Sequence, residues 1–368
     1  MDELFQTADE WGPYKVVHIN RPGAGLKAVV AVDNIACGPA IGGARMATDV
    51  SVSEACRLAR AMTLKNAAAG LAHGGAKSVI FADPRMPSAD KERLIRAFAG
   101  AIADITDYIV GPDMGTDEHC MGWIKDEIGR AVGLPREIGG IPLDEIGATG
   151  LGLATAIEAA QGNAGIDLKG ARIAVQGFGA VGKHAARFLA RQGAVLIAAS
   201  DTNGTLVDPG GLDVAALIAL KNDGRALHGH PSGQKLGVDA IIDVDCDIWI
   251  PAARPDVVHV GNVSRLKARL VAQGANIPLT EEAEVALHRR GVLVLPDFIA
   301  NAGGVICASV EYHGGSESAA LTAIVEKVGA NTRAVLAEAR RTGSPPRQAA
   351  TRLAEQRVRA AMASRRWR

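Results

Sequence analysis

The first third of the chain mixes strand-like and helix-like spacings of hydrophobic residues. Apolar runs at 14–19 (YKVVHI) and 26–32 (LKAVVAV) are joined by the turn sequence RPGAG, which predicts a β-hairpin. The segment 38–43 (GPAIGG) is typical of a glycine-rich turn. Period and length predict helices at 51–70 and 88–105, and strands at 78–82 and 108–113. Ser53 is the expected N-cap of the first helix and Gly70 its stop.

Beyond residue 150 the strands and helices alternate more tightly. The glycine- and proline-rich segment 136–150 is interpreted as a connector. The periods predict helices at 151–163, 181–192 and 212–222, and strands at 172–176, 195–200, 247–253, 269–275 and 292–297. Two C-terminal segments, 315–341 and 346–364, are helical by period, and the second is arginine-rich, which is interpreted as a solvated helix face. This alternation of strands and helices predicts a parallel, doubly wound sheet.

These patterns predict an α/β protein with two domains. We expect residues 1–140, joined by a C-terminal return at about 335–368, to form an α/β substrate-binding and oligomerisation domain. Residues 141–334 are expected to form a Rossmann dinucleotide-binding domain. A chain of 368 residues is long enough for two cores, since one core seldom exceeds roughly 250–300 residues.

Composition narrows the classes of function. The 40 basic and 40 acidic side chains balance, which argues against a nucleic-acid or membrane partner. The five cysteines form no CxxC pair, and no histidine cluster has metal-ligand spacing, so neither a disulfide framework nor a metal site is predicted. No apolar run is long enough for a membrane span, and no signal-peptide pattern is present, so a cytoplasmic location is expected.

The stretch 175–182 (VQGFGAVG) predicts a phosphate-binding turn. A buried strand leads into G-x-G-x-x-G, formed by Gly177, Gly179 and Gly182 with Ala180 and Val181 between them, and a helix follows. Glycines in this context allow backbone N–H groups to approach a pyrophosphate at the helix N-terminus. The alternative is a glycine-rich turn of another α/β protein.

A second strand ends at Asp201, 19 residues after Gly182. An acid at this position suits the ribose 2′-hydroxyl of NAD and repels the 2′-phosphate of NADP. NAD is therefore favoured over NADP, although neighbours such as Asn203 could rearrange the contacts.

The stretch 71–84 (LAHGGAKSVIFADP) places Lys77 after two glycines and an alanine, directly before a buried strand. Small residues permit close approach of a ligand, and desolvation lowers the pKa of a lysine. Lys65 lies 12 residues earlier, and Asp113 ends a strand in GPDMGTDE. Each has an ordinary alternative: a turn lysine for Lys77, a solvated helix-end cation for Lys65, and a turn or cap acid for Asp113.

The order of these motifs resembles the glutamate/leucine/phenylalanine/valine dehydrogenases over roughly residues 14–365. GLKAVVAV, GPAIGGARM, LARAMTLKNAAAGL and GGAKSVI are similar to leucine dehydrogenase. GPDMGTDEHCMGWIKDE, GGIPLDEIGATGLG, LVAQGANIPLT and PDFIANAGGV are more similar to glutamate dehydrogenase. The resemblance implies oxidative deamination of an L-amino acid to a 2-oxo acid and ammonium with a nicotinamide cofactor. It also implies a homo-oligomer, for which the N-terminal hairpin offers a sheet edge.

The resemblance also implies roles for individual residues of the first domain. Lys65 would bind the substrate α-carboxylate together with the backbone at Gly42 and Gly43. Lys77 would polarise the attacking water and stabilise the carbinolamine. Asp113 would move protons to and from the amino group.

In the second domain, the resemblance implies that Thr149, Asn276 and Asn301 line the nicotinamide and its ribose. Asn276 is expected to reach the substrate as well.

The side-chain pocket departs from the glutamate dehydrogenases. The lysine and serine that hold the side-chain carboxylate in those enzymes correspond here to Ile41 and Ala308. A buried carboxylate without a partner costs several kcal/mol, whereas burial of an aliphatic side chain contributes about 1.5–3 kcal/mol. An apolar substrate of the Leu, Val, Ile or Phe type is therefore expected. Two alternatives are a glutamate dehydrogenase with an atypical pocket and a non-catalytic NAD(H)-binding regulator.

Overall fold

The computed structural model describes residues 8–365, which divide into two compact units. Unit 1 contains the chain up to Leu143, Val305–Ala320, and the chain from Leu353. Unit 2 contains Asp144–Gly304 and Leu321–Arg352. The segment 305–320 thus packs in unit 1, although the strand–helix alternation assigns it to the dinucleotide domain. The helix α12 (Pro346–Ala363) begins in unit 2 and ends in unit 1.

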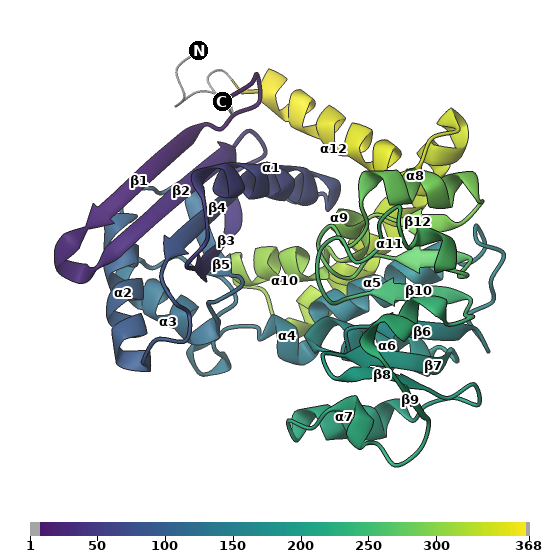
Figure 1. Cartoon of the computed structure of the whole chain (residues 1–368). Coiled ribbons are helices and arrows are strands. Elements are labelled where there is room, and N and C mark those ends of the chain that lie inside the picture. Colours follow the sequence, from purple (N-terminus) through teal and green to yellow (C-terminus); the bar gives the residue numbers. More distant parts are fainter. Residues whose placement is uncertain (1–7, 366–368) are drawn as a thin grey trace. The chain divides into compact units, whose positions relative to one another are not determined.

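A five-stranded sheet in the order β1-β2-β4-β3-β5 lies at the centre of unit 1. Its strands are β1 (Lys15–Arg21), β2 (Leu26–Asn34), β3 (Ala40–Ala47), β4 (Gly74–Phe81) and β5 (Tyr108–Pro112). β1 pairs antiparallel with β2, which confirms the predicted hairpin and leaves β1 at the edge (Figure 1). β4 pairs antiparallel with β2 and parallel with β3, and β3 pairs parallel with β5.

The expectation that GPAIGG is a turn is wrong, because most of it belongs to β3. Glycine has low strand propensity, which hides the strand in the sequence. Here glycine is required by close packing: a Cβ on Gly42 would lie 1.6 Å from the backbone oxygen of Ala76 on β4. β3 and β4 therefore approach each other so closely that no residue larger than glycine could occupy position 42.

Helices cover both faces of this sheet: α1 (Val52–Ala68) on one, α2 (Ser88–Ala101) and α3 (Glu118–Ile128) on the other (Figure 1). Side chains alternate along β2, so Val30 packs in the core under α2 and α3, whereas Val29 and Ala31 pack under α1. The expected cap Ser53 is wrong, since the Ser51 hydroxyl accepts the hydrogen bond from the Glu54 N–H.

The sheet of unit 2 has seven strands in the order β12-β11-β10-β6-β7-β8-β9. They are β6 (Arg172–Gln176), β7 (Val195–Asp201), β8 (Gly204–Val207), β9 (Gln234–Leu236), β10 (Ile248–Pro251), β11 (Leu270–Ala272) and β12 (Leu293–Leu295). The five from β12 to β7 are parallel, which confirms the predicted parallel sheet, and β8 and β9 add an antiparallel edge that the periods do not predict. The order reverses between β6 and β10, where ligands bind in sheets of this type.

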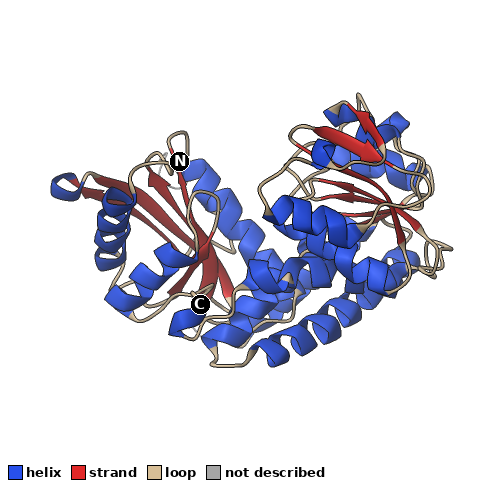
Figure 2. Cartoon of the chain, turned by 90° about the horizontal axis from the view of Figure 1, so that it is seen from below, coloured by secondary structure: helices blue, strands red, loops and turns tan. Residues whose placement is uncertain are grey.

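Helices flank this second sheet (Figure 2). From the connector onward the helices of the described chain are α4 (Leu143–Ile146), α5 (Ala148–Ala160), α6 (Ala180–Arg191), α7 (Val214–Asn222), α8 (Glu281–Arg289), α9 (Asp297–Ala300), α10 (Gly303–Tyr312), α11 (Glu317–Thr342) and α12. Of these, α10 lies mostly in unit 1. Short 3-10 helices are η2 (Pro22–Ala24), η3 (Arg136–Ile138), η4 (Leu227–Gly229), η5 (Val238–Asp243) and η6 (Val263–Arg265). Between residues 8 and 365, every helix is too short or too polar to cross a bilayer.

Candidate active site

Lys77 and Asp113 lie in direct contact in unit 1. The Lys77 Nζ is 2.8 Å from the Asp113 Oδ2, and the two side chains are 8% and 18% exposed. The sequence places these residues 36 positions apart, so their contact is a product of the sheet. The amine therefore faces an acid in a space that water enters poorly.

Strand alternation explains why these side chains meet. On β4, Ala76 and Ile80 pack toward α2 and α3, so Lys77 points to the opposite face. Asp113 follows the last residue of β5 and reaches the same face. Gly43 on β3 lies between them: a Cβ there would be 2.7 Å from the Cβ of Asp113 and 3.2 Å from the Lys77 Nζ. Glycine at this position thus provides the space in which the amine and the carboxylate meet.

Burial and charge act on this pair in different ways. Desolvation lowers the pKa of Lys77, and the attraction of Asp113 offsets only part of this effect. Burial alone would raise the pKa of Asp113, but the cations of Lys77 and Arg45 hold it below its usual value. The acid is therefore ionised over the ordinary pH range, and the amine releases its proton more easily than a surface lysine.

Arg45 is a site residue that the motif analysis misses. Its Nε donates to the Asp113 Oδ2 at 2.9 Å, the same oxygen that Lys77 contacts, and its Nη1 donates to Glu54 on α1 at 2.5 Å. The signal was available, because residues 41, 43 and 45 of a strand share one face. Because GPAIGG has the composition of a turn, the sequence does not reveal that alternation.

Asn66 on α1 also escapes the motif analysis. It is fully buried, and its Nδ2 donates to the backbone oxygens of Gly74 at 2.7 Å and Ile41 at 3.4 Å. The neighbouring Lys65 lies in the last turn of α1 and is half-buried. Gly42 lies within the ladder opposite Val110 of β5. The α-carboxylate role of Lys65 and of the backbone at Gly42 and Gly43 stays a prediction.

Ile41 and Ala308, far apart in sequence, come together in unit 1. They form one cluster with Ile109 of β5 and Val132, and all four are at most 6% exposed. Ala308 comes from α10, whose Glu311 one turn later accepts hydrogen bonds from the N–H groups of the segment after Val132. The cluster contains only hydrocarbon side chains. It is suited to an apolar group and offers nothing to a carboxylate.

The G-x-G-x-x-G turn of unit 2 has the geometry that the motif requires. Gly177 adopts a φ of +87°, which side chains rarely tolerate. A Cβ on Gly179 would meet nothing within 4 Å, so the backbone is open to a ligand. A Cβ on Gly182 would lie 2.1 Å from the Gly177 oxygen, so the third glycine permits helix–strand packing. Ala180 opens α6 and is exposed, with the half-buried Val181 after it.

A cavity of about 1080 Å³ adjoins this turn. Its lining includes Gly177 and Gly179 after β6, Asp201 at the end of β7, and the segment 252–257 after β10. It therefore lies at the carboxyl ends of the strands that flank the reversal of strand order, where open α/β sheets bind nucleotides.

Asp201 reaches this cavity, but its charge is partly neutralised. Its Oδ2 accepts from the Lys221 Nζ and the Leu227 N–H, both at 2.9 Å, and its Oδ1 accepts from the Asn203 N–H. Although burial alone would raise the pKa of Asp201, these donors keep it below its usual value. Arg254 and Arg265 also line the cavity. The acid thus repels a phosphate less than an isolated carboxylate would.

Asn276 and Asn301 lie side by side in unit 2. The Asn301 Nδ2 lies 3.1 Å from the Asn276 Oδ1, and it also donates to the backbone oxygens of Gly274 and Ala275. Thr149 at the start of α5 is close to the same turn, since a Cβ on Gly303 would lie 3.2 Å from its Cα. The structure therefore brings Asn276 and Asn301 together and places Thr149 next to Gly303, two residues after Asn301.

These residues fit a dinucleotide. A Cβ on Gly177 or Gly182 would collide with neighbouring backbone atoms, so both positions require glycine. The open space at Gly179 leaves room for a pyrophosphate. The Asn301 Oδ1 is buried without a hydrogen-bond partner, as expected for an acceptor that a ligand donor would satisfy.

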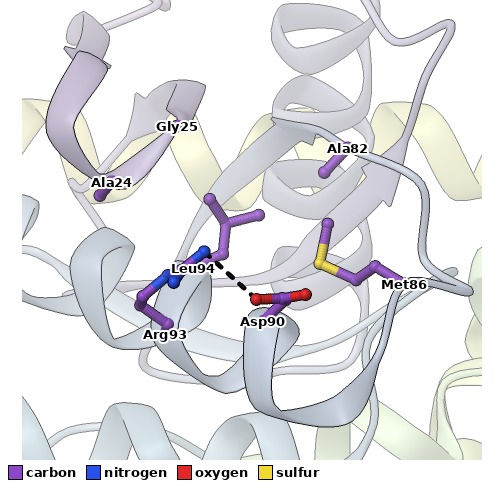
Figure 3. A pocket seen from close by; sticks show the side chains of 7 residues that line it. All are labelled: Ala24, Gly25, Ala82, Met86, Asp90, Arg93 and Leu94. Carbon is purple, nitrogen blue, oxygen red and sulfur yellow. Dashed lines mark ion pairs between the residues drawn. The ribbon is translucent and has the colours of Figure 1, made fainter.

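A second cavity, of about 280 Å³, lies in unit 1 and outside this site. It is lined by Ala24, Gly25, Ala82, Met86, Asp90, Arg93 and Leu94 (Figure 3). Its two charged groups, Asp90 and Arg93, pair with each other at 3.2 Å and are largely exposed. Because none of the predicted site residues lines it, this cavity does not contribute to the candidate active site.

Comparison with protein families matches both halves of the chain. A family model described as Glutamate/Leucine/Phenylalanine/Valine dehydrogenase matches residues 139–366. A second, described as Glu/Leu/Phe/Val dehydrogenase, dimerisation domain, matches residues 13–130.

Individual relatives agree with these matches. The chain is 36% identical over 357 residues to a glutamate dehydrogenase of Aeropyrum pernix, covering 91% of this chain and 85% of that protein. It superimposes on the Leu-bound form of a hetero-hexameric glutamate dehydrogenase from Thermus thermophilus with a TM-score of 0.87 and 30% identity, covering 97% and 91% of the two chains. It also superimposes on an L-tryptophan dehydrogenase from Nostoc punctiforme, with a TM-score of 0.74, 27% identity and coverages of 98% and 99%.

Proposed function

Because the chain belongs to the Glu/Leu/Phe/Val dehydrogenase family and is an amino acid dehydrogenase, we propose that its substrate is an L-amino acid with an apolar side chain. In the proposed reaction the L-amino acid, water and NAD⁺ give the 2-oxo acid, ammonium, NADH and a proton. The reverse reaction is a reductive amination.

The apolar cluster at Ile41 and Ala308 carries this proposal. A glutamate side chain placed against Ile41, Ile109, Val132 and Ala308 would bury a carboxylate without a partner, which costs several kcal/mol. A leucine-sized side chain would gain about 1.5–3 kcal/mol from burial at the same place. The two effects have opposite signs, so the cluster favours apolar substrates even though several relatives act on glutamate.

Lys77 and Asp113 supply the acid–base chemistry of this proposal. NAD⁺, when bound, accepts the hydride from the α-carbon. The Lys77 ammonium stabilises the negative charge that develops on oxygen as water adds to the imine carbon. The Asp113 carboxylate takes a proton from the attacking water and returns it to the leaving amine, and Gly43 leaves room for both groups.

The adenosine end of the cofactor is proposed to bind beside Asp201, and the nicotinamide beside Thr149, Asn276 and Asn301. Asp201 supports NAD over NADP, since a carboxylate accepts hydrogen bonds from a ribose hydroxyl. The ion pair with Lys221 reduces this preference without reversing it. We expect a modest selectivity for NAD⁺.

Self-association is proposed to use the first sheet. β1 is an edge strand of seven residues, and an uncovered edge of this length favours pairing with another chain. The matched family model for this region is described as a dimerisation domain. A homo-oligomer is therefore the expected state, and a cytoplasmic location stays a prediction from the composition.

A substrate panel tests the proposed function directly. NADH formation is measured with Leu, Val, Ile, Phe, Trp and Glu, each with NAD⁺ and with NADP⁺. We expect kcat/KM for the best apolar substrate to exceed that for glutamate by about a hundredfold or more, since each 1.4 kcal/mol is a factor of ten. Glutamate as the best substrate would contradict the pocket assignment. NADH binding without turnover of any amino acid would establish the non-catalytic regulator instead.

Removing Arg45 is expected to shift the acid limb of the activity profile. Arg45 favours the ionised form of Asp113, so Arg45→Met raises the pKa of that carboxyl, and the active form is lost at higher pH than in the wild type. In the acid limb kcat/KM falls by roughly tenfold relative to wild type, and the two proteins converge at alkaline pH. Arg45→Lys, which keeps the charge, recovers part of the difference. An unshifted acid limb would remove Arg45 from the proposed mechanism.

A further inference from the structure

We propose that Arg347, at the start of α12, is a positioning residue that holds the segment Gly274–Ile277 in the conformation needed for the nicotinamide half of the cofactor. The inference rests on the proposed cofactor role of Asn276, which lies in this segment. All residues concerned belong to unit 2.

The backbone of this segment is strained at Ile277. Its φ is +45°, a conformation that a β-branched residue rarely adopts, and the following Pro278 restricts it further. The side chain is 52% exposed, so packing does not impose the conformation. Residues held in such conformations cluster at ligand sites, where surrounding contacts enforce them.

Two backbone hydrogen bonds hold Ile277 in place. Its N–H donates to the Asp297 Oδ2 at 2.8 Å, and its C=O accepts from the Asp256 N–H at 3.0 Å. Asp256 lines the cofactor cavity and has a positive φ of its own, +54°. The conformation of the Asn276 segment therefore depends on where the Asp297 carboxylate is held.

Arg347 fixes that carboxylate. Its Nη2 donates to the Asp297 Oδ1 at 2.8 Å, and its Nε donates to both oxygens of Glu284 at 2.9 and 2.8 Å. Glu284 and Asp297 are 5% and 6% exposed, so two buried carboxylates share one guanidinium. Burial would lower the pKa of Arg347, but these carboxylates raise it, so it stays charged. The planar fork suits two acceptors at once in a way that an ammonium does not.

The same guanidinium also holds the other end of the segment. Its Nη2 donates to the Oε1 of Gln273, the fully buried residue directly before Gly274. Arg347 thus brackets Gly274–Ile277 through Gln273 on one side and through Asp297 on the other. Asn301 completes the frame with its donations to Gly274, Ala275 and Asn276. Without Arg347, relaxation of Ile277 to a negative φ would turn Asn276 away from the cofactor.

Binding of two ligands separates this role from a general structural one. NADH contains the nicotinamide half, whereas ADP contains only the adenosine and its two phosphates, which are proposed to bind beside Asp201 and Gly177. In Arg347→Lys we expect the Kd for NADH to rise by about tenfold and the Kd for ADP to stay within about twofold of wild type. Arg352→Met is the matched control on the same helix, since Arg352 donates to Thr342 and Ser344 and pairs with Glu338 at 3.9 Å, and it should change neither constant.

A rescue variant sharpens the test. Glycine adopts a φ of +45° without strain, so Ile277→Gly added to Arg347→Lys should recover at least half of the lost NADH affinity on a logarithmic scale. Asp297→Asn should weaken NADH binding without affecting the binding of ADP, and this variant replaces Arg347→Lys in the test if Arg347→Lys does not fold. Equal weakening of both ligands, no weakening of NADH, or no recovery with Ile277→Gly would each overturn the inference. Failure of the wild type to bind NADH would instead overturn the cofactor proposal on which it rests.

Discussion

Lys77→Met is expected to lower kcat by about a thousandfold or more and to remove a pH-dependent part of the free energy of unfolding. The substitution removes the cation that stabilises developing negative charge, a contribution typically worth about 10²–10³ in rate. It also takes from Asp113 the partner that sits 2.8 Å away, so the proton transfers lose their alignment. Both losses affect the same Lys77–Asp113 pair, so their effects on kcat are not expected to add in full.

The stability expectation follows from the direction of the Lys77 pKa. Desolvation lowers it, which means that the folded state disfavours the charged amine more than the unfolded state does. The wild type therefore gains stability as pH rises through the window that ends at the unfolded value of 10.5, and loses it as pH falls through the folded pKa. Lys77→Met removes this pH dependence and keeps the volume of the side chain.

Steady-state kinetics and thermal denaturation at several pH values measure both effects. Lys15→Met is the control, because the Lys15–Asp107 pair lies in the same unit with side chains 32% and 25% exposed. It should leave kcat unchanged. A Lys77→Met enzyme that keeps more than about a tenth of wild-type kcat would contradict the role of Lys77, since general acid–base and electrostatic groups contribute 10²-fold or more.

The parts of the site that a sequence can reveal are those fixed by local geometry. In the phosphate-binding turn, each glycine is required by the local geometry of a strand–turn–helix of eleven residues. The sequence alone therefore predicts the separate roles of Gly177, Gly179 and Gly182. The parallel sheet follows from the alternation of strands and helices in the same way. The antiparallel β8 and β9 are short and interrupt that alternation, which is why the periods miss them.

The glycines of β3 make this strand hard to recognise in the sequence. The pattern GPAIGG has the composition of a turn, yet most of it belongs to β3, which lies between β4 and β5. Glycine is needed at position 42 because the Ala76 backbone approaches too closely for any larger residue. Once this strand is misread, the shared face of Ile41, Gly43 and Arg45 cannot be seen. The role of Arg45 was lost for that reason, although the Lys77 and Asp113 pairing could be expected from the resemblance.

Other contacts depend on packing between distant segments. Arg347 meets Glu284 across 63 residues and Gln273 across 74, with the register of α12 deciding which arginine does so. Its helix contains several arginines with the same local pattern, and the sequence predicts that all of them lie on a solvated face. That interpretation is wrong for Arg347, which is mostly buried among carboxylates.

Ile41→Lys is expected to reverse the side-chain preference of the enzyme. The new ammonium lies where Ile41 now packs with Ile109, Val132 and Ala308, and the γ-carboxylate of glutamate is its natural partner. The lysine removes the cost of several kcal/mol for burying the glutamate carboxylate without a partner. An apolar substrate loses the about 1.5–3 kcal/mol that burial of its side chain contributes. At 1.4 kcal/mol per factor of ten, the ratio of kcat/KM for glutamate over leucine should rise by about a thousandfold.

The free enzyme provides a second measurement of the same effect. Without a bound carboxylate the lysine is buried and unpaired, so the variant should melt at a lower temperature than wild type, and 2-oxoglutarate should restore more of the loss than a branched-chain 2-oxo acid does. Ile41→Met, which keeps the cluster apolar at similar volume, should leave the substrate ratio nearly unchanged. If Ile41→Lys reduces activity on leucine and glutamate equally, the cluster does not contact the substrate side chain. The specificity would then have to reside in other residues.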